Sequence, residues 1–446
     1  MEQVTDMTQG KPAKLILSFA LPLILTNIGQ QLYMVVDSSI VGRGVGLKAL
    51  AAVGSADWTY WLILWTVQGL TQGFAVFISR YFGKQDYRNV NKTIAMSTIL
   101  CAIVGIVMTI IGLFSAKPLL MLLKTPHDII DNATIYLMTM IAGTLIVTAY
   151  NMAAAVLRAF GDGKSPLIAM AIAACLNVGL DLLFVMVFHW GVFGAAFASV
   201  TAQLFSFLFC LVRIRKVEYV QFAKGDCKFN GKMAAEMLAF GLPIALQMIV
   251  IAISGMVLQS AINIQESIFI AGYTAMNKMF GLLESSAFAL GAASSTFFAQ
   301  NYGAGRKDRV RSGVRTSAVI SVIMAVCVTF VMLLIGRYLL QMFIDATEEG
   351  ATEALQIGFR YLVIASVSLV TLYLIHVYRN AMQALGNSFW SMISGFAECA
   401  VRILVSKGAA LVLGTGVLYF VEPTAWVGAL LFIMIPYYCY QNKLLS

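Results

Sequence analysis

Long apolar stretches alternate with short polar segments along almost the whole chain. Each stretch reaches or nearly reaches the roughly 20 residues that a helix needs to cross a bilayer. The pattern predicts six spans in the first half, near 15–37, 55–79, 93–115, 133–157, 166–188 and 191–212. It predicts six more in the second half, near 233–261, 270–299, 314–336, 357–384, 388–416 and 423–440. We therefore expect an all-α membrane protein with twelve transmembrane helices.

The two halves of the chain resemble each other in sequence. Three pairs of segments match in the same order, at offsets of 220 to 225 residues: Phe19–Ile28 with Phe240–Ile249, Ile78–Val90 with Phe298–Val310, and Leu157–Ser165 with Met382–Trp390. An even number of spans in each half starts both halves on the same side, as in transporters built from parallel repeats. We expect a first lobe over 1–215, a cytoplasmic linker over 216–232 and a second lobe over 233–446. A central cleft between two six-helix lobes is an architecture for alternating access.

Composition and charge agree with a chain that lives in lipid. Hydrophobic residues make up 60% of the chain and charged residues 11%, against roughly 25% charged in soluble proteins. This balance excludes a large soluble catalytic domain. The net charge of +9 comes from Lys and Arg that lie mostly in the tails and in the loops after even-numbered spans, to which we also assign Arg379. The positive-inside rule then places both termini in the cytoplasm and requires no nucleic-acid partner.

The first half carries two acidic residues in apolar surroundings. Asp37 ends the first span, and Gln30 and Tyr33 precede it on the same helix face. Asp181 lies inside the fifth span, and Asn177 shares its face four residues earlier. An acid inside a bilayer is costly and marks a functional site by default. Headgroup contact at Asp37 remains an alternative.

Further polar residues accompany these acids. Asn151 lies in the fourth span, and Ser199 and Thr201 lie in the sixth. Carboxylate, amide and hydroxyl oxygens are the ligands that hard cations prefer, and a buried carboxylate can also carry a proton. The two asparagines could instead only bridge neighbouring helices. The sequence leaves Na⁺ and H⁺ equally open.

The second half has a different set of charges. Glu398 and Arg402 are four residues apart in the eleventh span, so they can pair with each other. Lys278 and Glu284 lie six apart in the eighth span and do not share a face. Their partners would be on other helices, and Lys278 could repel a cationic substrate or serve as a coupling charge.

Several sequence blocks resemble the multidrug and toxic compound extrusion (MATE) family. They are MVVDSSIVGRGVGLKALAAVGSA at Met34–Ala56, LRAFGDGKSP at Leu157–Pro166, NVGLDLLFV at Asn177–Val185, GVFGAAFASVTAQ at Gly191–Gln203 and AQNYGAGRKDRV at Ala299–Val310. They occur in the family's order and cover nearly the whole chain. The resemblance implies a two-lobed exporter of organic cations, driven by inward flow of Na⁺ or H⁺, with no other cofactor.

The resemblance also implies roles for individual residues. It places cation or proton coupling at Asp37, Asn177, Asp181 and a hydroxyl for which we favour Thr201 over Ser199, with the first three as Na⁺ ligands. We expect a substrate cavity with Gln30, Tyr33, Asn151, Ser199, Lys278 and Glu284. One family branch has acids in the seventh and tenth helices. This chain instead has Gln247, Gln259 and Asn263 in the seventh span and His376 and Arg379 in the tenth.

Other functions remain as alternatives. The same fold could flip or export a lipid-linked or other anionic metabolite, which a cleft lined by Lys and Arg would favour. A membrane enzyme lacks support because neither H-E-x-x-H nor G-x-S-x-G occurs, and a channel lacks a filter-like loop. We expect a monomer in the cell membrane that handles a small, cationic and amphipathic substrate and has no enzymatic activity.

Overall fold

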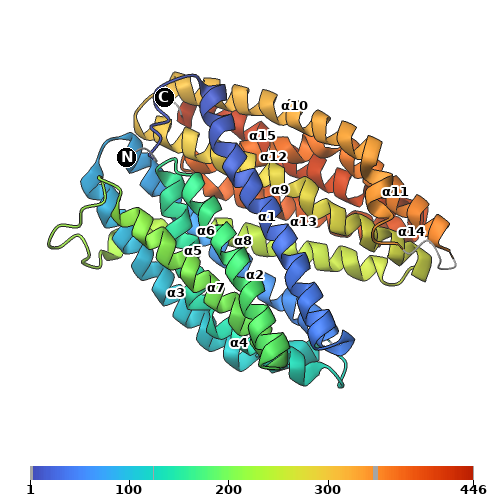
Figure 1. Cartoon of the computed structure of the whole chain (residues 1–446). Coiled ribbons are helices and arrows are strands. Elements are labelled where there is room, and N and C mark those ends of the chain that lie inside the picture. The colour runs from blue at the N-terminus through green and yellow to red at the C-terminus, as the bar shows by residue number, and fades with distance from the viewer. Residues whose placement is uncertain (1–3, 124, 345–349, 445–446) are drawn as a thin grey trace. The chain divides into compact units, whose positions relative to one another are not determined.

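The computed structural model describes residues 4–123, 125–344 and 350–444, and its regular elements in these ranges are all helices (Figure 1). The first half comprises α1 (Pro12–Gly44), α2 (Leu47–Gly83), α3 (Tyr87–Leu122), α4 (Ile130–Ala142), α5 (Thr144–Ala159), α6 (Lys164–Asp181), the π-helix η1 (Leu182–Val187) and α7 (Gly191–Arg215). The second half comprises α8 (Gly231–Ile262), α9 (Ser267–Gly303), α10 (Lys307–Leu340), α11 (Ala351–Val367), α12 (Leu369–Ala384), α13 (Ser388–Ile403), the π-helix η2 (Leu404–Ala409), α14 (Ala410–Leu413), the 3₁₀-helix η3 (Thr415–Phe420) and α15 (Val421–Leu444).

These helices are long and apolar enough to form a membrane protein. Within the described ranges, nine segments could cross a bilayer by length and composition, and eleven could if each of two bent helix pairs counts as one span. The remaining long helix, α9, has 37 residues but is more polar. The prediction of an all-helical membrane fold is therefore confirmed.

Two helix breaks and two π-helices repeat between the halves. The predicted fourth span is bent by 47° between α4 and α5, at Gly143, and the predicted tenth by 46° between α11 and α12, at Ser368. These two residues are 225 positions apart. The π-helix η1 follows α6, and η2 follows α13 in the same way, with starting residues 222 positions apart. Both offsets lie within the 220 to 225 positions that separate the matching segments of the sequence repeat. The apolar pattern of the sequence did not show the bends.

The chain divides into two compact units. Unit 1 contains residues 1–6 and 25–245, and unit 2 contains residues 7–24 and 246–446. The helices α1 and α8 therefore each contribute to both units, whereas the predicted lobe boundaries followed the linker. In unit 1, α2 packs against α3, α4 and α5, and α7 packs against α4, α5 and α6 (Figure 1). In unit 2, α9 packs against α10, α11 and α12, and α15 packs against α12 and α13.

Large apolar side chains cover much of the outer surface. On α10, the exposed side chains include Ile323, Val326 and Phe330, and on α3 they include Ile110 and Phe114. Polar groups lie inside instead: Asn177 and Asp181 are fully buried. This distribution reverses that of a soluble protein, and it is stable when hydrocarbon surrounds the helices.

Within unit 1, α2 and α8 approach each other closely at a glycine. A Cβ atom added at Gly69 would lie 2.6 Å from the Cα atom of Ala245 and 2.8 Å from its backbone nitrogen. Small residues that let helix backbones approach are the usual basis of helix packing in membranes. Gly69 therefore permits this contact, and a larger residue would have to push the two backbones apart.

We expect Gly69→Ala to lower the free energy of unfolding by about 1–2 kcal/mol, since overpacking outweighs the gain in helix propensity. The matched control is Gly54→Ala on the same helix, where an added Cβ meets open space. Thermal unfolding in detergent should show a melting temperature a few degrees lower for the first variant only. Equal melting temperatures for both variants would contradict the close contact.

Candidate functional site

The two acidic residues of the first half meet in the structure. Asp37 on α1 and Asp181 at the end of α6 are 144 positions apart in the chain, yet their carboxyl groups are hydrogen-bonded to each other. Both are buried, with 8% of Asp37 and none of Asp181 exposed. A carboxylate is only an acceptor, so this bond requires one of the two groups to hold a proton.

Helix geometry explains why the two acids can meet. Asp181 is the last residue of α6 and directly precedes the π-helix η1, where the helix widens by one residue per turn. Asn177 lies one α-helical turn before Asp181 and shares its face. Both side chains thus point inward from one stripe of α6.

A second polar contact lies beside this carboxyl pair. The Nδ2 atom of Asn177 donates to Oγ of Ser199 on α7 at 3.1 Å, and Ser199 Oγ lies 3.1 Å from the Tyr33 hydroxyl on α1. Tyr33 also lies close enough to Asp37 and Asp181 to interact electrostatically with both. Helices α1, α6 and α7 therefore contribute one connected group, which we call the first-lobe site: Tyr33, Asp37, Asn177, Asp181 and Ser199.

The two candidate hydroxyls of α7 have different environments. Thr201 donates its hydroxyl to the carbonyl oxygen of Phe197 in its own helix at 2.7 Å. Ser199 and Thr201 are two residues apart, which places them about 200° apart around the helix. Only Ser199 is hydrogen-bonded into the first-lobe site. The geometry thus favours Ser199 in the role that we assigned to Thr201.

Two buried tyrosines that the sequence did not single out lie near the first-lobe site. Tyr60 on α2 and Tyr136 on α4 are each less than a tenth exposed. Tyr136 lies within electrostatic reach of Asp37 and of Asp57, a further acid on α2. Asp57 falls at the predicted start of the second span, so its position appeared to be a helix end. Its place beside two tyrosines became visible only from the packing.

The ligand set of this site fits a small monovalent cation or a proton. Oδ1 of Asp37 is buried and has no hydrogen-bond partner among the described residues, and such an oxygen is available to a cation. Asn177 donates with its nitrogen to Ser199. Among the described residues, no three His, Cys, Asp or Glu side chains are grouped as a metal site.

The other predicted cavity residues lie in separate places. Asn151 on α5 donates to the Val147 carbonyl oxygen of its own helix at 2.9 Å, and Gln30 on α1 has an exposed side chain. In unit 2, Lys278 and Glu284 are both on α9, the lysine exposed and the glutamate half-buried. Their participation in one substrate cavity stays a prediction.

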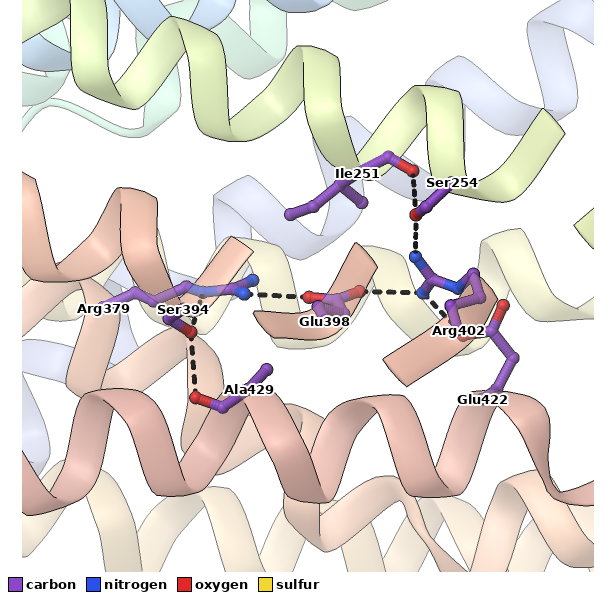
Figure 2. Close-up of polar contacts among 8 residues, drawn as sticks. All are labelled: Ile251, Ser254, Arg379, Ser394, Glu398, Arg402, Glu422 and Ala429. Atoms are coloured by element: carbon purple, nitrogen blue, oxygen red, sulfur yellow. Dashed lines mark hydrogen bonds and ion pairs between the residues drawn. The ribbon is translucent and has the colours of Figure 1, made fainter. Parts of the chain in front are cut away.

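Unit 2 contains a buried chain of alternating charges, which Figure 2 shows. Arg379 on α12 contacts Oε2 of Glu398 at 2.8 Å, and Arg402 contacts the other oxygen, Oε1, at 2.8 Å. Arg402 also contacts Glu422 on α15 at 2.7 Å and donates to the Ser254 hydroxyl on α8. We call Arg379, Glu398, Arg402 and Glu422 the second-lobe network. Glu284 on α9 lies within electrostatic reach of all four members.

This network confirms one pair and corrects one assignment. The predicted contact between Glu398 and Arg402 is present. Arg379 was assigned to a cytoplasmic loop, but it lies inside α12, is 5% exposed, and donates from Nε to Ser394 at 3.1 Å. The assignment of Arg379 to a loop was wrong because Glu398, a buried acid on another helix, compensates the charge of the arginine. Nothing in the local sequence showed that Ser254 and Glu422 belong to the same group.

Comparison with known proteins identifies similar chains. The MatE family model matches residues 22–183 and 243–406, once in each half. The probable multidrug resistance protein YpnP of Bacillus subtilis is 31% identical over 93% of this chain and 94% of its own length. The probable multidrug resistance protein NorM of Thermotoga maritima is 24% identical over 74% of this chain and 72% of its own length.

Solved structures show the same fold. An outward-facing multidrug resistance MATE family transporter of the MOP superfamily superposes with a TM-score of 0.90 at 21% identity, covering 100% of this chain and 99% of that one. A MOP superfamily transporter from Pyrococcus furiosus, described as having a binding pocket of reverse polarity, has a TM-score of 0.90 at 22% identity, covering 100% and 98%.

We expect Ser199→Ala to destabilise the protein by about 1–3 kcal/mol, because Asn177 and Tyr33 both lose their buried partner. The control is Thr201→Ala, which removes only a bond within α7 and should change stability by less than about 0.5 kcal/mol. Chemical denaturation in detergent measures both. A larger loss for Thr201→Ala would mean that the threonine, not the serine, belongs to the site.

Proposed function

Because the chain belongs to the MatE (multidrug and toxic compound extrusion) family, we propose that it exports organic cations across the cell membrane in exchange for Na⁺ or H⁺. Members of this family are membrane transport proteins for small molecules and not enzymes. The relatives carry names of multidrug resistance and export proteins, which supports drug-like cargo for this chain. We further propose a monomer whose two termini are cytoplasmic.

One observation carries the coupling proposal: two buried carboxyl groups in unit 1 share a hydrogen bond. Two such groups so close together resist ionising at the same time, because their negative charges repel in a medium of low dielectric constant. The pair therefore needs a compensating positive charge beside it. A proton, Na⁺ or a cationic substrate can each supply that charge.

Antiport follows from competition for this charge. When Na⁺ or H⁺ enters from outside, it neutralises Asp37 and Asp181 and weakens the attraction for a cationic substrate, which then leaves. The ion-loaded carrier returns to the inward-open state, where loss of the ion restores the attraction. Thermodynamic linkage requires the substrate to weaken ion binding by the same factor. The ion gradient thereby drives export by alternating access.

The contacts around the carboxyl pair support a responsive site. Tyr33 and Ser199 join α1 to α7, and Asn177 joins α6 to the same serine. Loading Asp37 or Asp181 would change the electrostatics of all three helices at once. The widened backbone of η1 directly after Asp181 gives α6 a place to adjust, as π-helical turns often do at functional sites.

An anionic cargo finds less support. The buried arginines that a lipid-linked phosphate would need, Arg379 and Arg402, are both engaged with Glu398, and Arg402 also with Glu422. Their charges are thereby neutralised within unit 2. Cationic cargo agrees better with the acidic first-lobe site.

We expect Asp37→Asn and Asp181→Asn each to reduce efflux of a cationic dye from cells at least tenfold, because an amide cannot exchange a proton or hold Na⁺ as a carboxylate does. The matched control is Asp131→Asn, since Asp131 is exposed and paired with Lys117 on the surface. Dye retention in cells with equal amounts of each variant measures the effect. Wild-type efflux by both site variants would exclude the coupling mechanism.

A second prediction concerns the driving ion. In vesicles with an imposed gradient of Na⁺ or of pH, we expect one of the two gradients to drive uptake of cationic dye, and the double variant Asp37→Asn/Asp181→Asn to respond to neither. Binding of a phospholipid head group analogue serves as the anionic comparison. Transport of the anion in preference to the dye would favour a flippase.

A further inference from the structure

Arg402 of the second-lobe network and its partner Ser254 match two residues of the first-lobe site in the repeat. Tyr33 and Ser254 are 221 positions apart, as are Pro22 and Pro243, and each pair lies in the first span of its half. Asn177 and Arg402 are 225 positions apart. The same offset separates Asp162 and Asn387, whose side chains accept from backbone nitrogens three residues later, at the start of α6 and of α13. At the 225-position offset that the starts of these two helices share, Arg402 matches Asn177.

Burial along the two helices supports this match. On α6, the inward-facing residues include Ala169, Met170 and Asn177. Residues 225 positions later, Ser394, Gly395 and Arg402, are buried on α13. Asp181 corresponds in this alignment to Ser406, which is also buried. The same stripe of the fifth span thus faces inward in both halves.

The contacts match as well. In unit 1, Asn177 of the fifth span and Tyr33 of the first span both contact Ser199 of the sixth. In unit 2, Arg402 of the fifth span of its half contacts Ser254 of the first and Glu422 of the last (Figure 2). Each half therefore joins its first, fifth and sixth spans through one polar group. The group in unit 2 contains arginine side chains, whereas the first-lobe site contains no basic side chain.

We propose that Arg402 is a tethered cation, which supplies permanently in the second lobe the positive charge that Na⁺ or H⁺ supplies reversibly in the first. Its guanidinium contacts two carboxylates, Glu398 and Glu422, and cannot lose its proton in a protein. The second lobe is thereby held in an ion-loaded state at all times. This inference rests on the proposed function only in taking the first-lobe site as the one that exchanges ions.

The charges of the network agree with this assignment. Arg379 and Arg402 balance Glu398 and Glu422, so the network is neutral while both arginines are present. Removing Arg402 leaves two carboxylates facing one guanidinium, with Glu398 buried and the Glu422 side chain 22% exposed, and an uncompensated buried charge is strongly unfavourable. A small cation or a proton would then be drawn into the gap. Glu284, which is within reach of these groups, adds to that attraction.

The test asks whether removing Arg402 creates a new ion requirement. The background is Asp37→Asn/Asp181→Asn, in which the first-lobe site no longer exchanges ions, and into it we place Arg402→Ala and, separately, Arg402→Gln. Melting temperatures of the purified protein are measured with Na⁺ replaced stepwise by choline at constant ionic strength, and across pH at constant salt. Binding to the folded state alone appears as a saturable rise in melting temperature.

We expect the melting temperature of the background variant to be independent of Na⁺ and pH. Both Arg402 variants should show a saturable rise in melting temperature of about 3 °C with one of the two ions. The Na⁺ and pH series distinguish which ion enters. The control Arg402→Lys keeps a fixed positive charge and should gain no ion dependence. The exposed Arg337→Ala on α10 should behave like the background.

A purely structural ion pair would give a different result. Arg402→Ala and Arg402→Gln would then lower the melting temperature without any saturable dependence on Na⁺ or H⁺, which would overturn the proposal, as would an equal ion dependence in Arg402→Lys. Because no transport is measured, this result is independent of the antiport proposal. Loss of dye export by Asp37→Asn tests that proposal separately.

Discussion

The cost of an unbalanced charge inside a bilayer governs the organisation of this protein. An ionised side chain away from water is unfavourable by several kcal/mol unless it is paired, protonated or bound to a cation. The structure contains both permanent and reversible solutions. Glu398 and Glu422 are compensated by two arginines, whereas Asp37 and Asp181 share a hydrogen bond that needs a proton. We propose that the carboxyl pair can exchange its positive charge, whereas the arginines keep theirs.

The helices position these groups through departures from regular geometry that occur twice. Each half bends its fourth span by almost the same angle, 47° and 46°, and each continues its fifth span as a π-helix. Backbone groups released at such places must be satisfied inside the protein, because lipid offers no hydrogen bonds. The π-helix η1 directly follows Asp181, and η2 begins two residues after Arg402. The backbone irregularity and a buried acidic or basic residue therefore occur together in both halves. A duplicated fold has thus retained its framework while its polar groups have diverged.

Sequence reasoning found part of the candidate site for a clear physical reason. Asp37, Asn177 and Asp181 stand out because polar residues are rare within apolar spans, and the structure brings all three into one group with Tyr33. The choice between Ser199 and Thr201 required knowing how α7 is rotated about its axis. Arg379 was assigned to a loop, and Ser254 and Glu422 were not singled out by the sequence. Ser254 and Glu422 contact Arg402 on a different helix directly, and Arg379 is linked to it through Glu398.

The sequence by itself determined that the chain lies in lipid, that its fold is all-helical and that its two halves are repeats of each other. These follow from the length of apolar stretches, from charge scarcity and from a repeat with a nearly constant offset, all of which are properties of the chain read in one dimension. The tertiary structure alone decided which polar groups meet. Helical periodicity fixes the neighbours of a residue within its own helix, but the rotation, bending and packing of helices decide which side chains face each other across 100 or more positions. For that reason the acids and Arg402 could be named from the sequence, whereas the contact between the two acids and the contacts of Arg402 with Ser254 and Glu422 could not.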